Sequence, residues 1–204
     1  MATISLFEHP RHTDHLRLRD GRTLTVRFVG ADEGEALQRY FRNLSLSSRH
    51  SRFLGAMSEL PPRELGHFLR VGENNRFSVI ATVATNGRET IVGEARYGLD
   101  TASRRFEFGI SVDDLWQRLG IGSALIANLE CRAAALGARV MFGETLRSNE
   151  KMISLARKLG YGFARHPDDW KLVRFEKEID AVAEEFPCAS WKLVAQQRAI
   201  EAVA

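Results

Sequence analysis

The chain has 204 residues, of which 44% are hydrophobic and 27% are charged, and this ordinary globular composition argues against a disordered, collagen-like or coiled-coil protein. The 29 Lys and Arg residues only slightly outnumber the 26 Asp and Glu residues, and because the cations are scattered along the chain they indicate no nucleic-acid-binding face. No apolar run approaches the roughly 20 residues needed to cross a bilayer, and no signal peptide is recognisable, so we expect a cytoplasmic protein without a membrane partner.

Two groups of side chains could in principle bind metals, but neither has the pattern of a metal site. Cys131 and Cys188 are too few for a disulfide framework or a four-ligand zinc site, so we expect reduced thiols, with Cys131 a small buried side chain. His9, His12 and His15 lie among arginines, and Pro10 breaks any helix that would align them. We therefore expect no metal and interpret residues 1–20 as a solvated arm.

The first half of the chain predicts strands with helices inserted early. Residues 23–29 alternate apolar and polar side chains, as in a half-buried strand, and Asp32 is a candidate N-cap for a helix that runs to Arg42. Pro61-Pro62 favours the start of a second, short helix. Asn86-Gly87 predicts a hairpin turn, and the strands of a meander are expected at residues 77–85, 90–97 and 105–112.

The second half alternates helices and strands. Apolar residues at helical spacing predict a helix over 120–136, which Gly137 ends. Asn149 is a candidate N-cap for a further helix, which ends at Gly160. Strands are expected at residues 140–145, 161–166 and 170–176. Residues 179–204 are expected to form a helical extension, broken by Pro187, that could pack on the domain, support a homodimer or fray.

The most informative segment is the loop from Gln117 to Gly122, between a predicted strand and an amphipathic helix. Two glycines at a helix start leave the backbone N–H groups of the first turn open to a ligand. Those donors and the helix dipole favour an anion such as a pyrophosphate. A glycine pair alone is weak evidence, and the loop lacks the lysine of a Walker loop and the third glycine of a dinucleotide fingerprint.

With its surroundings, the loop resembles a known family. A strand, Gln117-Arg118-Leu119-Gly120-Ile121-Gly122, a helix, another strand, Asn149 and Leu159-Gly160-Tyr161 follow one another as in the GCN5-related N-acetyltransferases (GNAT). The segments Leu44-Ser45-x-x-Ser48-Arg49-x-x-Arg52-Phe53 and Ile91-Val92-Gly93-x-Ala95-Arg96-Tyr97 look like the acetyltransferase domain of bacterial protein lysine acetyltransferases. The resemblance spans residues 23–176. It implies an α/β (α+β) GNAT domain over residues 21–178, with a mixed, mostly antiparallel sheet, a splayed parallel strand pair and helices on both faces.

The resemblance also implies where acetyl-CoA binds. Its pyrophosphate would lie on the backbone amides of the loop, its pantetheine arm along the strand that ends at Val112, and Asn149 at the mouth of the split between the parallel strands. The implied cofactor-binding residues are Ile110, Val112, Gln117, Arg118, Leu119, Gly120, Ile121, Gly122, Ser123 and Asn149.

Glu107 is the candidate general base. An amine nucleophile such as lysine is protonated at neutral pH, so a base must remove a proton. Strand alternation alone favours a surface residue paired with Arg105, and the resemblance reverses this preference in favour of the catalytic role. Small-molecule acetyltransferases of the family often carry a tyrosine near the position of Ala156, and its lack here fits the protein-lysine branch.

The sequence thus predicts an N-acetyltransferase that uses acetyl-CoA, with a protein lysine as the first choice of acceptor. A small amine, such as a polyamine or an amino acid, is one alternative, and a catalytically silent acyl-CoA-binding module is another. Several side chains stay open between an acceptor-site role and a structural one. These are Ser45, Ser48, Arg49, Arg52 and Glu144.

Overall fold

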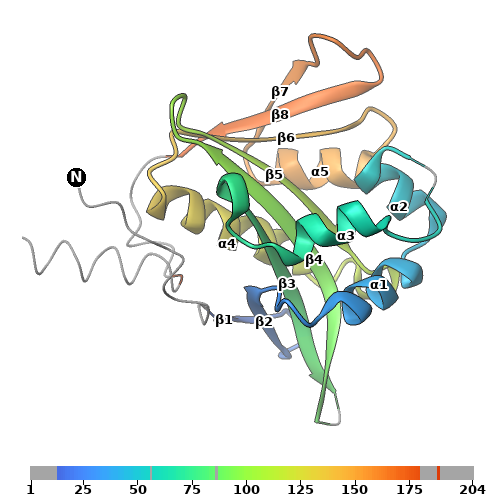
Figure 1. Cartoon of the computed structure of the whole chain (residues 1–204). Coiled ribbons are helices and arrows are strands. Elements are labelled where there is room, and N and C mark those ends of the chain that lie inside the picture. The colour runs from blue at the N-terminus through green and yellow to red at the C-terminus, as the bar shows by residue number, and fades with distance from the viewer. Residues whose placement is uncertain (1–12, 56, 86, 180–187, 189–204) are drawn as a thin grey trace, which may run out of the picture.

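One sheet organises the part of the chain that the computed structural model describes, which is residues 13–55, 57–85, 87–179 and 188 (Figure 1). Its strand order is β1-β2-β3-β4-β5-β6-β8-β7, and all neighbouring pairs are antiparallel except β5 and β6, which are parallel. The strands are β1 (Asp14–Arg17), β2 (Thr23–Phe28), β3 (Arg76–Thr85), β4 (Arg88–Asp100), β5 (Arg105–Val112), β6 (Val140–Leu146), β7 (Gly162–Arg165) and β8 (Leu172–Glu178).

Helices cover both faces of this sheet, as the sequence predicts. The helices are α1 (Gly34–Asn43), α2 (Leu46–Phe53), α3 (Pro62–Leu69), α4 (Ile121–Ala135) and α5 (Glu150–Lys158), with single 3-10 turns η2 (Glu73–Asn75) and η3 (Asp114–Trp116). One apolar core joins α1 and α3 to the sheet through Leu37, Phe41 and Phe68. The larger core lies on the other face, where Leu125 and Leu129 of α4 pack on β3 to β6. Within the described ranges no helix is both long and apolar enough to cross a bilayer.

The parallel strands β5 and β6 diverge partway along their length. Their register pairs Arg105 with Val140 and continues to Glu107 and Phe142, where it ends. Beyond this point β6 pairs only with β8, and β5 only with β4. The last residues of β5 therefore have a free edge that faces a widening gap in the sheet, as expected for the splayed strand pair.

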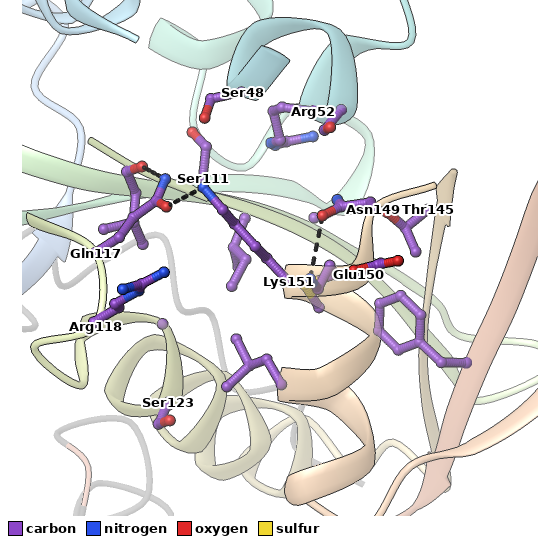
Figure 2. A pocket seen from close by; sticks show the side chains of 18 of the residues that line it. Ser48, Arg52, Ser111, Gln117, Arg118, Ser123, Thr145, Asn149, Glu150 and Lys151 are labelled. Carbon is purple, nitrogen blue, oxygen red and sulfur yellow. Dashed lines mark hydrogen bonds between the residues drawn. The ribbon is translucent and has the colours of Figure 1, made fainter. Parts of the chain in front are cut away.

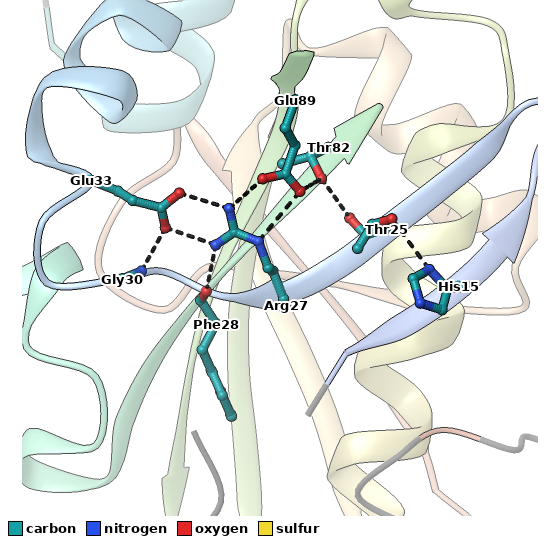
Figure 3. A network of polar contacts seen from close by, with 8 residues as sticks. All are labelled: His15, Thr25, Arg27, Phe28, Gly30, Glu33, Thr82 and Glu89. Atoms are coloured by element: carbon teal, nitrogen blue, oxygen red, sulfur yellow. Dashed lines mark hydrogen bonds and ion pairs between the residues drawn. The ribbon is translucent and has the colours of Figure 1, made fainter. Parts of the chain in front are cut away.

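An arginine between two carboxylates fastens β2 to its neighbours (Figure 3). The guanidinium of Arg27 donates to Glu33 at 2.7 and 2.8 Å and to Glu89 at 2.7 Å. Thr82 donates a further hydrogen bond to Glu89. Hydrogen bonds from Arg27 are the largest cause that holds the pKa of both Glu33 and Glu89 below the usual value for a glutamate. The cluster links β2, β3, β4 and the turn before α1.

The structure differs from the sequence prediction at three helix and strand positions. Residues 14–17, assigned to a solvated arm, form the edge strand β1, which pairs with β2 in antiparallel register. Helix α2 occupies residues for which the sequence predicts no helix. The N-cap of α1 is Glu33 and not Asp32, because the first helical bond runs from Leu37 N–H to the Glu33 carbonyl, while the Glu33 carboxylate turns back to Gly30 N–H and Arg27. The predicted helical extension lies outside the described residues except for Ile179 and Cys188.

The expectation of reduced thiols is wrong for this structure. Cys131 of α4 forms a disulfide with Cys188, 57 residues further along the chain. Cys131 is buried as predicted, but it is a covalent anchor for the C-terminal segment and not merely a small apolar side chain. Two cysteines so far apart in sequence give no local signal of pairing, since only the fold brings their Cα atoms within bonding range.

Candidate active site

A cavity of about 630 Å³ lies where β5 and β6 diverge, a volume typical of small-molecule sites, which range from roughly 300 to 1,000 Å³. The cavity is lined by the end of β5, the loop before α4 with the first turn of that helix, the end of β6, α5 and one side of α2 (Figure 2), together with Arg19 and Phe175. The free edge of β5 thus becomes one wall of a pocket.

The loop before α4 presents backbone donors to this cavity. Arg118 and Gly120 adopt positive φ angles of 66° and 91°, so the chain turns sharply into the helix. Among the described residues no side chain caps α4, and its first intrahelical bond runs from Ala124 N–H to Gly120 C=O, which leaves the N–H groups before it without a partner there and open to a ligand. The lack of a side chain at Gly122 also allows α5 to pack closely on the start of α4, because a Cβ there would lie 3.0 Å from Leu155 of α5.

Cations surround these donors. Arg118 lines the cavity with Arg19, Lys151 and Lys158, and Lys151 Nζ reaches from α5 to donate to Gln117 Oε1 at 2.8 Å (Figure 2). Four cations beside a free helix N-terminus suit the phosphates of a nucleotide-bearing ligand. Sequence reasoning missed Arg19, Lys151 and Lys158. The spacing of Lys151 and Lys158, two helical turns apart on α5, was a readable signal that both face the same side.

Asn149 links the end of β6 to α5, as the predicted N-cap. Its Oδ1 accepts a hydrogen bond from Met152 N–H at 3.2 Å, and its Nδ2 donates to Thr145 Oγ1 at 2.9 Å. Both Asn149 and Thr145 line the cavity. The residue therefore positions the wall formed by α5 and is itself exposed to a ligand there.

Helix α2 forms the opposite wall with hydroxyl groups and one guanidinium. Ser45 caps it by accepting from Ser48 N–H at 3.1 Å, and Asp114 accepts from the hydroxyls of both serines at 3.0 and 2.8 Å. Burial alone would raise the pKa of Asp114, but hydrogen bonds from Ser45 and Ser48 outweigh it, so this pKa lies below its usual value. Ser48 and Arg52 line the cavity, whereas Arg49 turns away and donates to the carbonyls of residues 57 and 58.

Glu107 is the last residue of β5 before the strands diverge. It is exposed, shares a face of the sheet with Gly109 and Ser111, and does not itself line the cavity. Arg105, the surface partner considered for it, donates instead to Glu176 at 2.8 Å. Glu107 is thus placed at the edge of the site without the ion pair that the structural interpretation required.

The structure brings together most of the predicted binding residues. Leu119 and Ile121 do not line the cavity, and the Ile121 side chain is buried in the core. The predicted residues that do line it are Ile110, Val112, Gln117, Arg118, Gly120, Gly122, Ser123 and Asn149.

Glu144, the last of the residues left open, and Tyr161 both have side-chain partners within the protein. Glu144 lines the cavity but accepts hydrogen bonds from Arg174 at 2.6 and 3.0 Å. Tyr161 is buried and donates to Glu130 at 3.0 Å. Among the described residues no group of three metal-ligating side chains gathers.

Comparison with known proteins agrees with this geometry. The model of the Acetyltransferase (GNAT) family matches residues 38–161, more than half of the chain. The chain belongs to the GNAT acetyltransferase family. A curated acetyltransferase from Pseudomonas aeruginosa is 29% identical over 152 residues, which cover 74% of this chain and 82% of that protein.

Solved structures place this acetyltransferase in the same fold. The GNAT domain of S. lividans PAT is 25% identical, with a TM-score of 0.74 over 83% of this chain and 98% of that one. The yncA protein from Salmonella typhimurium, solved with its cofactor acetyl-CoA, is 18% identical, with a TM-score of 0.60 over 78% of this chain and 96% of that one. The chain is therefore an N-acetyltransferase of a family that uses acetyl-CoA.

Proposed function

We propose that this acetyltransferase moves the acetyl group of acetyl-CoA to a protein lysine, by direct attack of the amine in a complex of both substrates, with Glu107 as general base. One observation carries the proposal: a single cavity joins the free helix N-terminus at residues 120–123 to the edge of β5 just beyond Glu107. The donor's anionic end and its acyl end thereby have separate places in one continuous site.

The donor end of the site suits acetyl-CoA. Backbone N–H groups of the α4 first turn, with Arg118, Lys151 and Lys158, would hold the pyrophosphate and neighbouring phosphates. The free edge of β5 at Ile110 and Val112 offers main-chain groups to the amide-bearing pantetheine arm.

The acceptor end suits an amine. Glu107 would take a proton from the ammonium group, directly or through a water molecule, so that the nitrogen lone pair can attack the thioester carbon. As the new C–N bond forms, the C–S bond breaks and CoA leaves as a thiolate, and the attacking nitrogen releases its second proton to that thiolate or to water to give the neutral amide. Position 156 on α5 is a buried alanine and therefore offers no phenol to protonate the thiolate. A thiolate is a fair leaving group near neutral pH without such an acid.

A protein lysine is the proposed acceptor because of similarity to S. lividans PAT, a protein acetyltransferase. We further propose a location in the cytoplasm and a homodimer.

Two measurements test the proposal. The first is thermal unfolding with saturating acetyl-CoA, with NADH and ATP as controls. A selective rise in Tm of several degrees is expected, since a ligand at about 100 times its Kd adds roughly 2.7 kcal/mol to the stability. The second is release of CoA thiol with a synthetic peptide that contains one internal lysine, compared with spermidine and free amino acids. Turnover of small amines alone would contradict the protein acceptor, and binding without thiol release would indicate a silent acyl-CoA-binding module.

A further inference from the structure

A buried ion pair stands behind the acyl end of the cavity. Arg52 of α2 donates from Nε to Glu94 Oε1 at 2.7 Å and from Nη2 to Glu94 Oε2 at 3.1 Å. The Glu94 side chain is 2% exposed, and that of Arg52 is 16% exposed. The carboxylate therefore lies behind the guanidinium, which meets the cavity.

A chain of hydroxyl groups fixes this pair. Ser111 of β5 donates to Glu94 Oε1 at 2.6 Å, and Tyr40 of α1 lies 2.9 Å from the Ser111 hydroxyl. Burial would lower the pKa of Arg52, but the charge and hydrogen bonds of Glu94 outweigh it, so Arg52 stays protonated. The guanidinium is thus charged and held in one orientation before any substrate binds.

One nitrogen of Arg52 is left for a ligand. Nε and Nη2 are taken by Glu94, and Nη1 makes no hydrogen bond within the described part of the chain. Nη1 lies 2.7 Å from the position that a Cβ on Gly109 would occupy, directly over β5. Gly109 is two residues beyond Glu107 on the same face of the strand, so a separation of roughly 7 Å along the strand divides the free donor from the proposed base.

We propose that Arg52 is a catalytic residue, which donates a hydrogen bond from Nη1 to the thioester carbonyl oxygen of the bound donor as that oxygen gains negative charge. The inference rests on the proposed function. Attack by the amine moves the carbonyl π electrons onto oxygen, and collapse of the resulting intermediate returns them to carbon as the C–S bond breaks. A charged donor already aimed at that oxygen stabilises the transition state more than the ground state, because no reorganisation is needed at the moment of reaction.

Helix α2 offers a matched control for the test. Arg49 lies three residues before Arg52 and binds the carbonyls of Met57 and Ser58 at 3.1 and 2.8 Å, outside the cavity lining. Its loss would loosen the same helix without removing a donor from the site. Turnover of acetyl-CoA with the single-lysine peptide is measured for the full-length wild type, Arg52→Gln, Arg52→Lys and Arg49→Gln, together with the Kd of acetyl-CoA and the Tm of each variant.

The expected result is a loss of kcat of about 100-fold or more for Arg52→Gln, the size seen when one donor to an oxyanion is removed. The Kd of acetyl-CoA should stay within about threefold, and Arg52→Lys should lose less, because it keeps the charge. Arg49→Gln should keep kcat within about threefold. A folded Arg52→Gln variant with nearly normal kcat, or an equal loss in Arg49→Gln, would overturn the inference.

A second variant covers the case in which Arg52→Gln does not fold. Gly109→Ala keeps Arg52 and Glu94 but places a methyl group where Nη1 now lies. Reduced kcat with an intact Kd is expected, and unchanged kcat would overturn the inference. If the wild type does not turn over the peptide, the proposed function fails, and not the inference about Arg52. The wild-type assay gives that result before any variant is compared.

Discussion

Lys151 Nζ lies 2.8 Å from Gln117 Oε1, so a side chain from α5 spans to the loop that precedes α4. These two elements form opposite walls of the donor end of the cavity (Figure 2). The lysine is held beside the loop where a pyrophosphate is expected, and this contact gives the first prediction.

Lys151→Met should weaken acetyl-CoA binding by roughly 10- to 100-fold, because a charge-assisted hydrogen bond to a phosphate contributes roughly 1.5–3 kcal/mol. Titration calorimetry at low and moderate salt measures the effect, which should shrink as salt screens the charge. Lys171→Met, at a lysine that lies over the Trp170 ring and outside the cavity lining, is the control and should bind as the wild type does. Equal affinity in both variants would place Lys151 outside the cofactor contacts.

Glu107→Gln should lower kcat more than tenfold and leave the affinity for acetyl-CoA nearly intact. The amide keeps the shape of the side chain but cannot take a proton from the ammonium group. Glu176→Gln, which changes the carboxylate of β8 that is bonded to Arg105, is a suitable control for the loss of one charge on this surface. Normal turnover in Glu107→Gln would remove Glu107 from the mechanism.

The Cys131–Cys188 disulfide predicts that the purified protein has no reactive thiol until it is reduced. Alkylation of the denatured protein followed by intact-mass measurement should find no modified cysteine without reductant and two with it. Cys188→Ser should lower the unfolding free energy by roughly 2–4 kcal/mol, the usual effect of a disulfide that closes a long loop. Two modified cysteines without reductant would contradict the disulfide. That result would fit the proposed location in the cytoplasm, where disulfides are rare.

The Arg27 cluster predicts a specific loss of stability in acid. The pKa values of Glu33 and Glu89 are depressed in the folded protein, so at mildly acidic pH the native state keeps both carboxylates ionised while the unfolded chain binds protons. Their contribution is present above the ordinary glutamate pKa of 4.5 and is lost as pH falls through the lower, folded values. Denaturant unfolding of Arg27→Gln from pH 7 to pH 3 should therefore show a shallower decline than that of the wild type. If the unfolding free energies of the two proteins fall in parallel as the pH is lowered, the cluster does not determine the loss of stability in acid.

Much of the sheet could be predicted because its strands have local signals. The strand at residues 105–112 was placed within its observed bounds, since RFEFGISV alternates apolar and polar side chains. Asn149 was identified as a helix cap, because an asparagine before an apolar periodic segment stabilises a first turn with its own side chain.

Helix α2 could not be predicted from local sequence signals. None of its residues is buried, so it lacks the apolar stripe by which a helix is recognised. Asp114, which accepts a hydrogen bond from the capping residue Ser45, lies 69 residues after it in the sequence. The pairing of Arg52 with Glu94, 42 residues apart, escapes sequence reasoning for the same reason, since only the packing of α2 against the sheet brings them together.

The lack of a side chain at Gly109 couples the substitutions that positions 52 and 109 can accept. Because Arg52 Nη1 occupies the space that a Cβ would need, a side chain at residue 109 displaces the guanidinium unless residue 52 is shorter. The order of substitutions therefore matters, and a change that is harmless in one background is damaging in the other. Among relatives, glycine at 109 should accompany arginine at 52, and a double-mutant cycle on this pair should give a large interaction energy.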